Sequence, residues 1–377
     1  MAAKKGSEML SILEGIEISV GNKKKPKLTT WTDREMCDMF TYGLPALDSA
    51  SNCGGSPRGR VIEIYGPESC GKSYTALKMI AAFQAAGENV CLIDVEHSFW
   101  GPWAAQQGVD INKLVYGQNF TSGEQAMDYA KEVCKTGKFA LVVIDSIAAL
   151  LPKAESESEF TDNARVGAHA AMMSRTLRVV QDEASKTDTT LVCINQTRTK
   201  IGGYGDPEET PGGKALKFYA THRISLRRVG IEKGKVDGTE KPIGIRTKVK
   251  FVKNKTGQPF GEDEFVIYFA AGSNTPIVQL VNLAIRLKVV GGRKASEEDE
   301  DIKHYHWKVD GDLVDTGCGS AADLAEWFEA QDLVLDVLNM VEAKAKEKVV
   351  EVPEEVTAIR TSLVQKKVDP EAEEKAE

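Results

Sequence analysis

Short apolar runs alternate with longer amphipathic segments over most of the chain. Runs rich in β-branched residues predict four strands, at Arg60–Tyr65, Asn89–Val95, Ala140–Asp145 and Thr190–Asn195. The first run is followed by a glycine-rich turn and then by an amphipathic segment, Ser73–Ala86, that predicts a helix. Strands this apolar, separated by helices, are typical of a parallel sheet covered by helices.

The pattern changes in the second half of the chain. Three strand candidates, Arg223–Arg228, Arg246–Lys253 and Glu264–Phe269, follow one another without intervening helices. They predict an antiparallel extension at the edge of the sheet. From about residue 273, helix candidates at Ile277–Leu287 and Ala321–Ala330 flank a short strand pair, which predicts a small α/β domain.

The two ends of the chain differ from its middle. Apolar residues between positions 9 and 16 mix spacings of three and four, which predicts a helix, and the basic run Lys23–Lys27 reads as a linker or a solvated loop. After about residue 345 the chain is rich in Glu, Lys and Val, which predicts a disordered tail. We therefore expect four regions: an N-terminal arm and linker at 1–45, a core at 46–272, a small C-terminal α/β domain at 273–345 and a charged tail at 346–377.

Composition and charge narrow the class of protein. Of the 377 residues 42% are hydrophobic and 28% charged, as in an ordinary globular protein. No apolar run approaches the roughly 18 residues that a membrane span needs, so no membrane partner is expected. The seven cysteines form no CxxC pair, which excludes a zinc ribbon and fits a reducing cytoplasm. A net charge of −8 argues mildly against a nucleic-acid binder unless basic residues gather locally.

A phosphate-binding loop stands between the first predicted strand and the first predicted helix. The segment GPESCGKS matches GxxxxGK[ST], and a strand before it and a helix after it are the context that this motif requires. Its glycines let the backbone wrap phosphates, Lys72 reaches the β- and γ-phosphates, and Ser73 supplies a hydroxyl to Mg²⁺. The residues assigned to nucleotide binding here are Gly66, Pro67, Glu68, Ser69, Cys70, Gly71, Lys72, Ser73 and Tyr74.

Polar residues follow three of the other strand candidates. Asp145 closes ALVVID and predicts a Walker B acid that orients Mg²⁺, although a strand-terminal Asp can equally cap a helix. Glu96 follows LIDV, where a carboxylate can activate water as general base or be an exposed capping residue. Gln196 closes TLVCINQ and is placed to sense the γ-phosphate, an ordinary loop amide being the alternative. Together these residues predict an ATPase with a central parallel sheet.

Several blocks of sequence resemble the bacterial and phage RecA homologous recombinases. They are VIEIYGPESCGKS, LIDVEH, VVIDSIAALLPKAE, INQTRTKIG, GGKALKFYA and VKNK, in family order over about residues 44–272. The resemblance implies an α/β fold with a RecA-type P-loop core, and ATP and Mg²⁺ as cofactors. It implies that Glu96 is the catalytic base and that Gln196 couples the γ-phosphate to DNA. It also implies that Trp103 and Phe269 stack on the adenine.

The resemblance further implies assembly into a homo-oligomeric helical filament, with the N-terminal arm packed on a neighbour. Lys253 and Lys255 of VKNK match lysines that reach a neighbouring subunit's ATP, where added cations stabilise transition-state charge. Taken as isolated residues, they would be solvated surface lysines. Phe218 matches an inter-subunit aromatic residue, its alternative being a buried helix residue.

For DNA, the resemblance implies two loops, Glu157–Val166 and Thr197–Gly213, that hold single-stranded DNA. It also implies a second basic group for homologous double-stranded DNA, with an evenly solvated face as the alternative. Single-strand-binding and mediator proteins are further candidate partners. The loop and helix residues expected to contact DNA are Arg165, Arg175, Arg178, Arg198, Lys200, Gly212 and Gly213, and the second basic group is Arg227, Arg228, Lys248 and Lys250.

Several departures from the family pattern affect these expectations, and two of them concern predicted contacts. Trp100 stands where the family usually has Asp, near the adenine, and Ala171 stands where an arginine often lies. The implied function is a cytoplasmic DNA-dependent ATPase recombinase that pairs and exchanges strands in DNA repair and recombination. The alternatives are another RecA-fold ATP-driven DNA motor, such as a helicase, and a non-enzymatic ATP-binding module. The intact phosphate loop and Glu96 argue against the latter.

Overall fold

The computed structural model describes residues 38–156, 167–199, 208–236, 239–269, 276–294, 303–309, 312–318 and 321–348. The predicted N-terminal helix, the charged tail after Lys348, and Arg165 and Lys200 of the two predicted DNA loops lie outside these residues. The chain divides into two units, Met1–Asp38 and Met39–Glu377. Tyr42 and Leu44, near the start of the second unit, are buried in its core.

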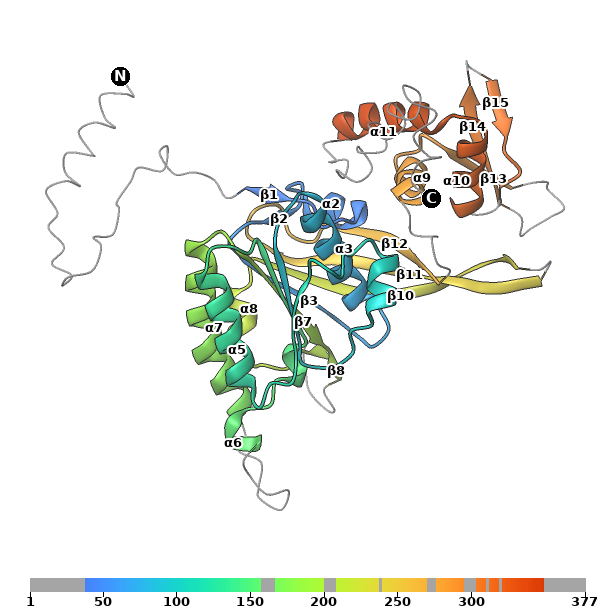
Figure 1. The fold of residues 1–377 in the computed structure, drawn as a ribbon. Coiled ribbons are helices and arrows are strands. Elements are labelled where there is room, and N and C mark those ends of the chain that lie inside the picture. The colour runs from blue at the N-terminus through green and yellow to red at the C-terminus, as the bar shows by residue number, and fades with distance from the viewer. Residues whose placement is uncertain are drawn as a thin grey trace, which may run out of the picture. The chain divides into compact units, whose positions relative to one another are not determined.

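An eight-stranded sheet forms the centre of the second unit, in the order β12-β11-β10-β3-β7-β6-β4-β5 (Figure 1). Six neighbouring strands are parallel, and β11 and β12 continue the sheet in antiparallel fashion beyond β10. This confirms the predicted parallel sheet with an antiparallel extension. The strands are β3 (Val61–Gly66), β4 (Val90–Asp94), β5 (Val115–Gly117), β6 (Leu141–Asp145), β7 (Thr190–Gln196), β10 (His222–Val236), β11 (Thr239–Asn254) and β12 (Glu262–Tyr268).

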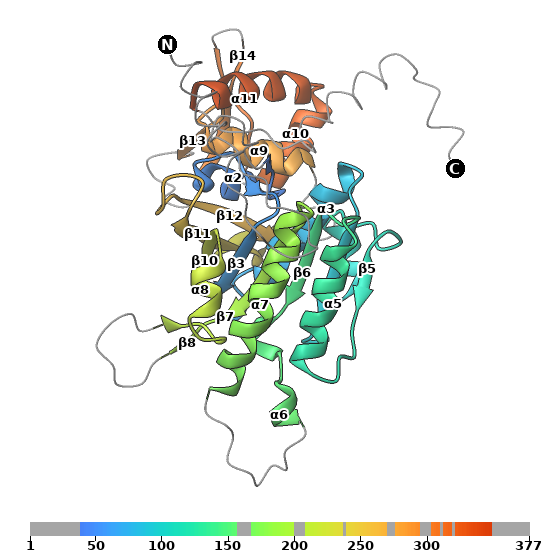
Figure 2. The ribbon, with the colours of Figure 1, turned by 90° about the vertical axis from the view of Figure 1, so that its left-hand side faces the viewer.

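Successive side chains of each strand point to opposite faces of the sheet. Because the central strands are apolar, both faces are apolar, and helices cover both. Ile62 and Ile64 of β3 share an apolar core with α3 (Lys72–Ala85), close to the predicted Ser73–Ala86. Val61 belongs to a second core. That core lies with α5 (Gly123–Lys135), α7 (Ala168–Lys186) and α8 (Ala215–Tyr219), and Figure 2 shows α5 and α7 side by side. Burial on both faces explains why the central strands are apolar throughout.

Short elements complete the sheet region. β1 (Met39–Phe40) pairs with β2 (Ser56–Pro57), and α2 (Pro45–Ser51) lies between them in the chain. The others are α4 (Gly101–Gln106), the 3₁₀ turn η2 (Ile147–Ala149), α6 (Lys153–Ser156), β8 (Arg198–Thr199) and β9 (Glu208–Glu209). None of the described helices is long and apolar enough to cross a membrane.

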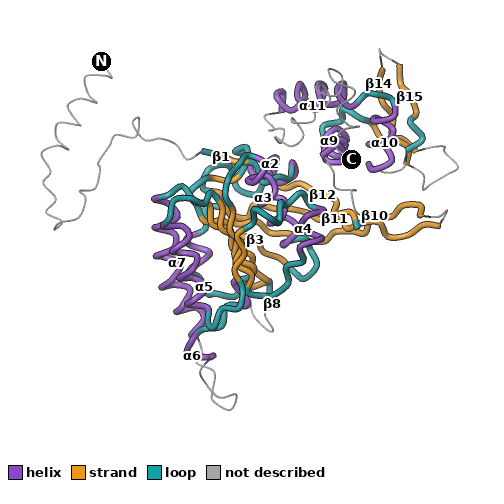
Figure 3. The backbone as a smooth tube through the Cα atoms, viewed as in Figure 1, coloured by secondary structure: helices purple, strands orange, loops and turns teal. Residues whose placement is uncertain are grey.

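Helices and strands make up the described part of the C-terminal segment (Figure 3), and its apolar core is formed largely by its own residues. Leu280, Phe328 and Leu338 of three different helices are buried in it, together with Trp307. The predicted helix Ala321–Ala330 is confirmed as α10, and the predicted strand pair as β14 and β15. The elements are α9 (Pro276–Arg286), β13 (Gly291–Lys294), β14 (Lys303–Val309), β15 (Asp312–Asp315), α10 (Ala321–Ala330) and α11 (Val334–Lys348).

A buried histidine joins the first strands to the sheet. The two ring nitrogens of His222 lie 2.6 Å from the Tyr42 hydroxyl and 2.7 Å from Thr256 Oγ1. Burial lowers the pKa of His222 to about 4, against an ordinary value of about 6.5. The imidazole is therefore neutral in the folded protein at neutral pH.

This burial makes stability depend on pH. Between pH 6.5 and 4 the unfolded chain protonates His222 and the folded chain does not, so we expect stability to fall as pH falls through this window. A His222→Gln variant should start less stable at pH 7, because two hydrogen bonds are altered, yet lose less on acidification. Thermal unfolding of the wild type and the variant at pH 7 and pH 5 measures how much stability each protein loses on acidification. Equal losses in the two proteins would contradict the assignment.

Candidate nucleotide and nucleic-acid site

The phosphate loop joins β3 to α3 at the carboxyl edge of the sheet, and two of its glycines have no room for a side chain. A Cβ on Gly66 would lie 2.2 Å from the Leu226 carbonyl oxygen. Gly71 has a φ of +93°, and a Cβ there would lie 2.5 Å from Ile267 Cδ1. Gly66 is required because a Cβ would collide with the backbone of Leu226, and Gly71 because L-residues avoid its positive φ. The loop that results presents backbone N–H groups at the start of a helix, where anions bind.

Side chains of the phosphate loop point in two directions. The Lys72 ammonium donates to the carbonyl oxygens of Pro67, at 2.6 Å, and Gly66, at 3.2 Å, so it lies across the loop. The Ser73 hydroxyl donates to Asp145 Oδ2 at 2.9 Å. Cys70 and Tyr74 are buried, and the Tyr74 ring stacks on Phe265, so their side chains face the core. Cys70 and Tyr74 were both predicted to bind the nucleotide. Because their side chains face the core, only their backbone groups are available for that contact.

Three carboxylates gather where β4 and β6 end. Asp94 is the partner of Asp145 in the parallel pairing of these strands, and Glu96 follows β4. Burial raises the pKa of Asp145 to about 7, and the charges of Glu96 and Asp94 act in the same direction. A buried carboxylate next to like charges gains from a bound cation, which would replace the missing solvation.

Glu96 and Gln196, from neighbouring parts of the edge, are in direct contact. Gln196 Nε2 donates to Glu96 Oε1 at 2.8 Å, and the Ser146 hydroxyl donates to the same oxygen. Both residues are exposed, whereas Ser146 is fully buried. The predicted base and the predicted sensor thus form one hydrogen-bonded group, and sequence reasoning gave Ser146 no role in it. Its position directly after Asp145 was the available signal.

The residues at this edge fit a magnesium nucleotide. Mg²⁺ prefers oxygen ligands and takes few of them from protein, and the Ser73 hydroxyl and Asp145 carboxylate are adjacent oxygen donors beside the loop. Lys72 adds a cation for phosphate oxygens. Among the described residues, no group of three or more His, Cys, Asp or Glu side chains forms a closed metal site. An open, two-ligand arrangement of this kind leaves coordination positions for phosphate and water.

Aromatic residues flank a small cavity beside this edge. The cavity has a volume of about 70 Å³, and Ser73, Asp145 and Trp103 line it. Trp100 is 69% exposed at its rim, where the family pattern has Asp. Phe269, directly after β12, is 53% exposed and does not line the cavity. The structure therefore brings Trp103 to the phosphate loop and leaves Phe269 outside this lining.

The two lysines of VKNK lie toward the opposite end of the sheet from the phosphate loop. Arg223 is the partner of Lys253 on β11 and of Glu63 on β3, which places Lys253 level with the first half of β3. Lys253 Nζ donates to the carbonyl oxygen of Lys217 at 2.6 Å and to that of Phe218 at 3.0 Å. Burial, with Lys255 and Arg223 nearby, lowers the pKa of Lys253 to about 8. Lys253 is partly buried and Lys255 is exposed, and both lie away from their own phosphate loop.

Phe218 is exposed at the end of α8. Its side chain is 69% accessible, so the alternative that it is a buried helix residue is wrong. Lys255 Nζ lies 3.4 Å from the Phe218 carbonyl oxygen, so the exposed ring and both lysines share one surface. An exposed phenyl ring beside two cations is suited to contact another protein surface.

The ends of the two predicted DNA loops meet at the start of α7. A Cβ on Gly213, whose φ is +68°, would lie 2.7 Å from Ala170 Cβ, and Gly212, with φ of +91°, lies against Ile147. Gly212 is buried, so packing and backbone conformation account for both glycines without a close approach of DNA. Arg175 and Arg178 are exposed on α7, and Arg198 is exposed on β8. The structure thus brings the two loop ends together and leaves these three arginines accessible.

The second basic group lies on β10 and β11. Arg227 and Lys248 are cross-strand partners, and Arg227 and Arg228 are exposed. Lys248 and Lys250 both form ion pairs with Glu262 of β12. Sequence reasoning missed this acidic neighbour, because strand register decides which residues lie opposite each other.

A buried ion pair at the centre of the sheet was also missed. Glu63 is fully buried and accepts a hydrogen bond from Arg223 Nε and another, of 3.0 Å, from Asn195 Nδ2. Asn195 Nδ2 also donates to the Pro211 carbonyl oxygen at 3.1 Å. This network links Asn195, the residue before Gln196, to Pro211 near the end of the second predicted loop. Through Glu63 it also links Asn195 to Arg223 of β10, the cross-strand partner of Lys253. Glu63 is the charged residue within the apolar run VIEIY, and this position could have indicated a buried charge from the sequence.

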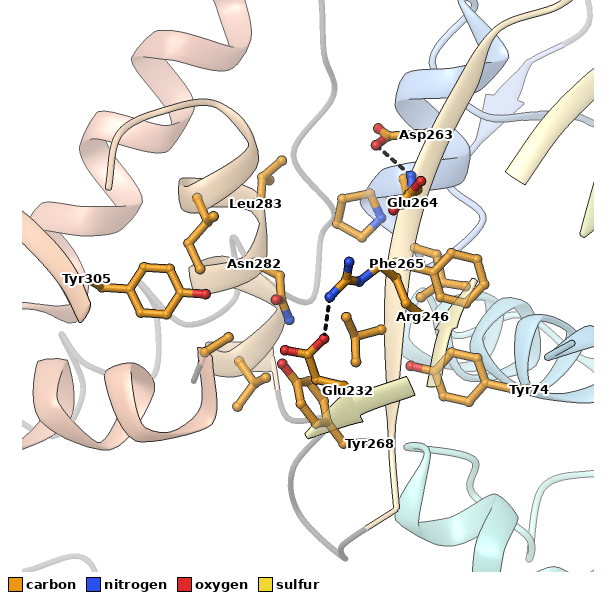
Figure 4. Close-up of a pocket in the computed structure, with 17 residues that line it drawn as sticks. Tyr74, Glu232, Arg246, Asp263, Glu264, Phe265, Tyr268, Asn282, Leu283 and Tyr305 are labelled. Carbon is orange, nitrogen blue, oxygen red and sulfur yellow. Dashed lines mark hydrogen bonds and ion pairs between the residues drawn. The ribbon is translucent and has the colours of Figure 1, made fainter. Parts of the chain in front are cut away.

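A second cavity, of about 310 Å³, is lined by Tyr74 but by no other residue of the phosphate loop. Figure 4 shows Glu232 and Arg246 in its wall, facing each other, and they form an ion pair of 2.8 Å. Phe265 and Tyr268 of β12 also line it. This 310 Å³ cavity therefore lacks the residues expected to bind phosphate. The candidate nucleotide site lies at the carboxyl edge of the sheet, beside the smaller cavity.

The amino-acid sequence is similar to the sequences of known proteins. A family model described as the RecA N-terminal domain matches residues 8–274. Protein RecA of Leifsonia xyli subsp. xyli is 46% identical over 241 residues, covering 64% of this chain and 66% of that protein. Protein RecA of Chlorobaculum parvum is 44% identical over 274 residues (70% and 77%), and that of Thermus thermophilus 40% over 291 residues (77% and 84%). The crystal structure of the RadB recombinase aligns with 62% of this chain at a TM-score of 0.46 and 21% identity.

Proposed function

This chain belongs to the RecA family of recombinases, and we propose that it assembles on single-stranded DNA and drives strand exchange with the residues described above. Members of the family are DNA-dependent ATPases of recombination and repair, and DNA binding and filament formation come with membership. What is specific to this chain is which of its residues carry each step. The observation that carries the proposal is the contact between Glu96 and Gln196 beside the phosphate loop.

In this proposal the phosphate loop and Lys72 hold the ATP phosphates. Ser73 and Asp145 would hold Mg²⁺, which would neutralise charge on the phosphates. Glu96 accepts a proton from the attacking water through Oε2, because Ser146 and Gln196 both donate to Oε1. A fixed carboxylate within reach of water is what general-base catalysis needs. Trp103 lies where it can stack on the base, and Trp100 replaces a family Asp with an aromatic surface.

Coupling to DNA would begin at Gln196. A γ-phosphate competes with Glu96 for the Gln196 amide, so ATP and its hydrolysis would shift this residue between two partners. The second loop follows Gln196 directly, and Asn195 holds its far end at Pro211. Arg175, Arg178 and Arg198 are the described cations that would then contact DNA phosphates. Arg165 and Lys200 would join them.

Assembly supplies the remaining cations. Lys253 and Lys255 lie far from their own phosphate loop, so they would serve the ATP of a neighbouring protomer, as the exposed Phe218 beside them would serve the contact between protomers. Because the lysines are delivered only by a neighbour, hydrolysis would require a filament. Homologous double-stranded DNA would bind at Arg227, Arg228, Lys248 and Lys250. Single-strand-binding and mediator proteins are proposed as partners in loading.

The test is ATP hydrolysis measured with and without long single-stranded DNA, with the Lys72→Ala variant as the negative control. We expect single-stranded DNA to stimulate hydrolysis strongly in the wild type but not in Lys72→Ala, because the ammonium of Lys72 is needed to hold the phosphates. An equal rate without DNA would favour another RecA-fold motor, and binding of ATP without hydrolysis would favour a regulatory module.

A further inference from the structure

The second basic group presents its lysines on one face of the sheet extension. Lys248 and Lys250 are two residues apart on β11, so their side chains leave the strand on the same side. Arg227 of β10 is the cross-strand partner of Lys248 and therefore shares that face. Both lysine side chains are about two-fifths exposed, at 41% and 43%. This face would offer a polyanion three cations within one patch.

A single carboxylate occupies both lysines. Glu262 on β12 is the cross-strand partner of Lys250, and its side chain is 34% exposed. Its Oε2 lies 2.6 Å from Lys248 Nζ, and its Oε1 lies 2.6 Å from Lys250 Nζ. Hydrogen bonds from Lys248 and Lys250 lower the pKa of Glu262 to about 2, so the carboxylate is charged at neutral pH. Glu264, the cross-strand partner of Lys248, adds a second negative charge to the same strand.

We propose that Glu262 is an internal counter-ion that competes with DNA phosphates for Lys248 and Lys250 and so weakens the second DNA site of this chain. The inference rests on the proposed function, in which these lysines bind the incoming DNA. A phosphate that approaches either lysine must displace a carboxylate oxygen and then remain close to its negative charge. Because the ion pairs are exposed, they are weak enough for a polyanion to displace.

A weakened second site has a consequence for strand exchange. Homology is tested by base pairing with the first strand, so the protein must hold an incoming duplex without trapping one that fails to pair. A site whose cations are partly neutralised releases such a duplex faster, since most changes in affinity appear in the dissociation rate. Glu262 therefore sets how long an unmatched duplex stays on the filament.

The test uses the full chain, assembled on a saturating amount of unlabelled single-stranded oligonucleotide with Mg²⁺ and a slowly hydrolysed ATP analogue. A second, fluorescent oligonucleotide without homology is then titrated, and its anisotropy is followed at several NaCl concentrations. For Glu262→Gln we expect about threefold to tenfold tighter binding of the second oligonucleotide at low salt. We also expect the log–log salt dependence to steepen by about one unit for each lysine freed. Binding of the first strand should not change.

Two controls separate the inference from the function on which it rests. Glu132→Gln removes the same charge from α5, where Glu132 pairs with Lys131 at 3.3 Å and Lys135 at 3.5 Å, and should leave second-strand binding unchanged. Lys248→Gln with Lys250→Gln should weaken it. If the lysine variants weaken binding and Glu262→Gln equals the wild type, the counter-ion role is overturned and the second site stands. If neither changes binding, the second site itself is overturned.

Discussion

A Glu96→Gln variant is expected to hydrolyse ATP about 10²- to 10⁴-fold more slowly in the presence of single-stranded DNA, the range that a general base contributes. The amide cannot accept the proton of the attacking water at neutral pH. Its carbonyl oxygen can still accept the hydrogen bonds that Ser146 and Gln196 donate, so the geometry of the site is kept. ATP binding and assembly on DNA should therefore persist. Single-turnover hydrolysis, with nucleotide binding measured in parallel, separates the two effects.

The charge-matched control for this variant is again Glu132→Gln, which lies on the exposed face of α5 and should hydrolyse ATP at the wild-type rate. Retention of DNA-dependent hydrolysis by Glu96→Gln would remove Glu96 from the role of base. A loss of ATP binding together with hydrolysis would instead assign Glu96 a part in holding the nucleotide.

Loss of the buried carboxylate Glu63 is expected to destabilise the fold by about 3–5 kcal/mol, because it leaves a charge in the sheet without its counter-ion. In Glu63→Ala, Arg223 and Asn195 each lose an acceptor at a site from which water is excluded. Chemical denaturation of the nucleotide-free protein measures the change. The large effect comes from breaking the pair rather than from a large net contribution of the pair.

A double replacement distinguishes these two explanations. Glu63→Leu combined with Arg223→Met removes both charges and keeps apolar volume, so it should be less destabilising than either single change. If the double variant shows the sum of the single losses, the two side chains contribute independently and the ion pair is not the cause. ATP hydrolysis by the double variant would further show whether this network links Asn195 to the face beside Lys253.

The sequence alone determined those features that are encoded in short, contiguous segments. The apolar runs predicted β3, β4, β6 and β7 within one or two residues, since strands buried on both faces must be apolar along their whole length. The phosphate loop was recognisable because its glycines and Lys72 are constrained by local backbone geometry. Asp145, Glu96 and Gln196 could be placed at one edge, because parallel strands end at the same edge of a sheet.

Only the tertiary structure decided which distant residues meet. Glu63 and Arg223 are 160 positions apart, and their contact depends on β10 lying next to β3 in the sheet. Strand register, which no local periodicity encodes, brings Glu262 to Lys248 and Lys250. The same sheet order places Lys253 far from its own phosphate loop, which a motif within one chain cannot reveal. Short contiguous segments determine the local chemistry of the site. The pairing of distant segments depends instead on how the whole sheet buries its apolar faces.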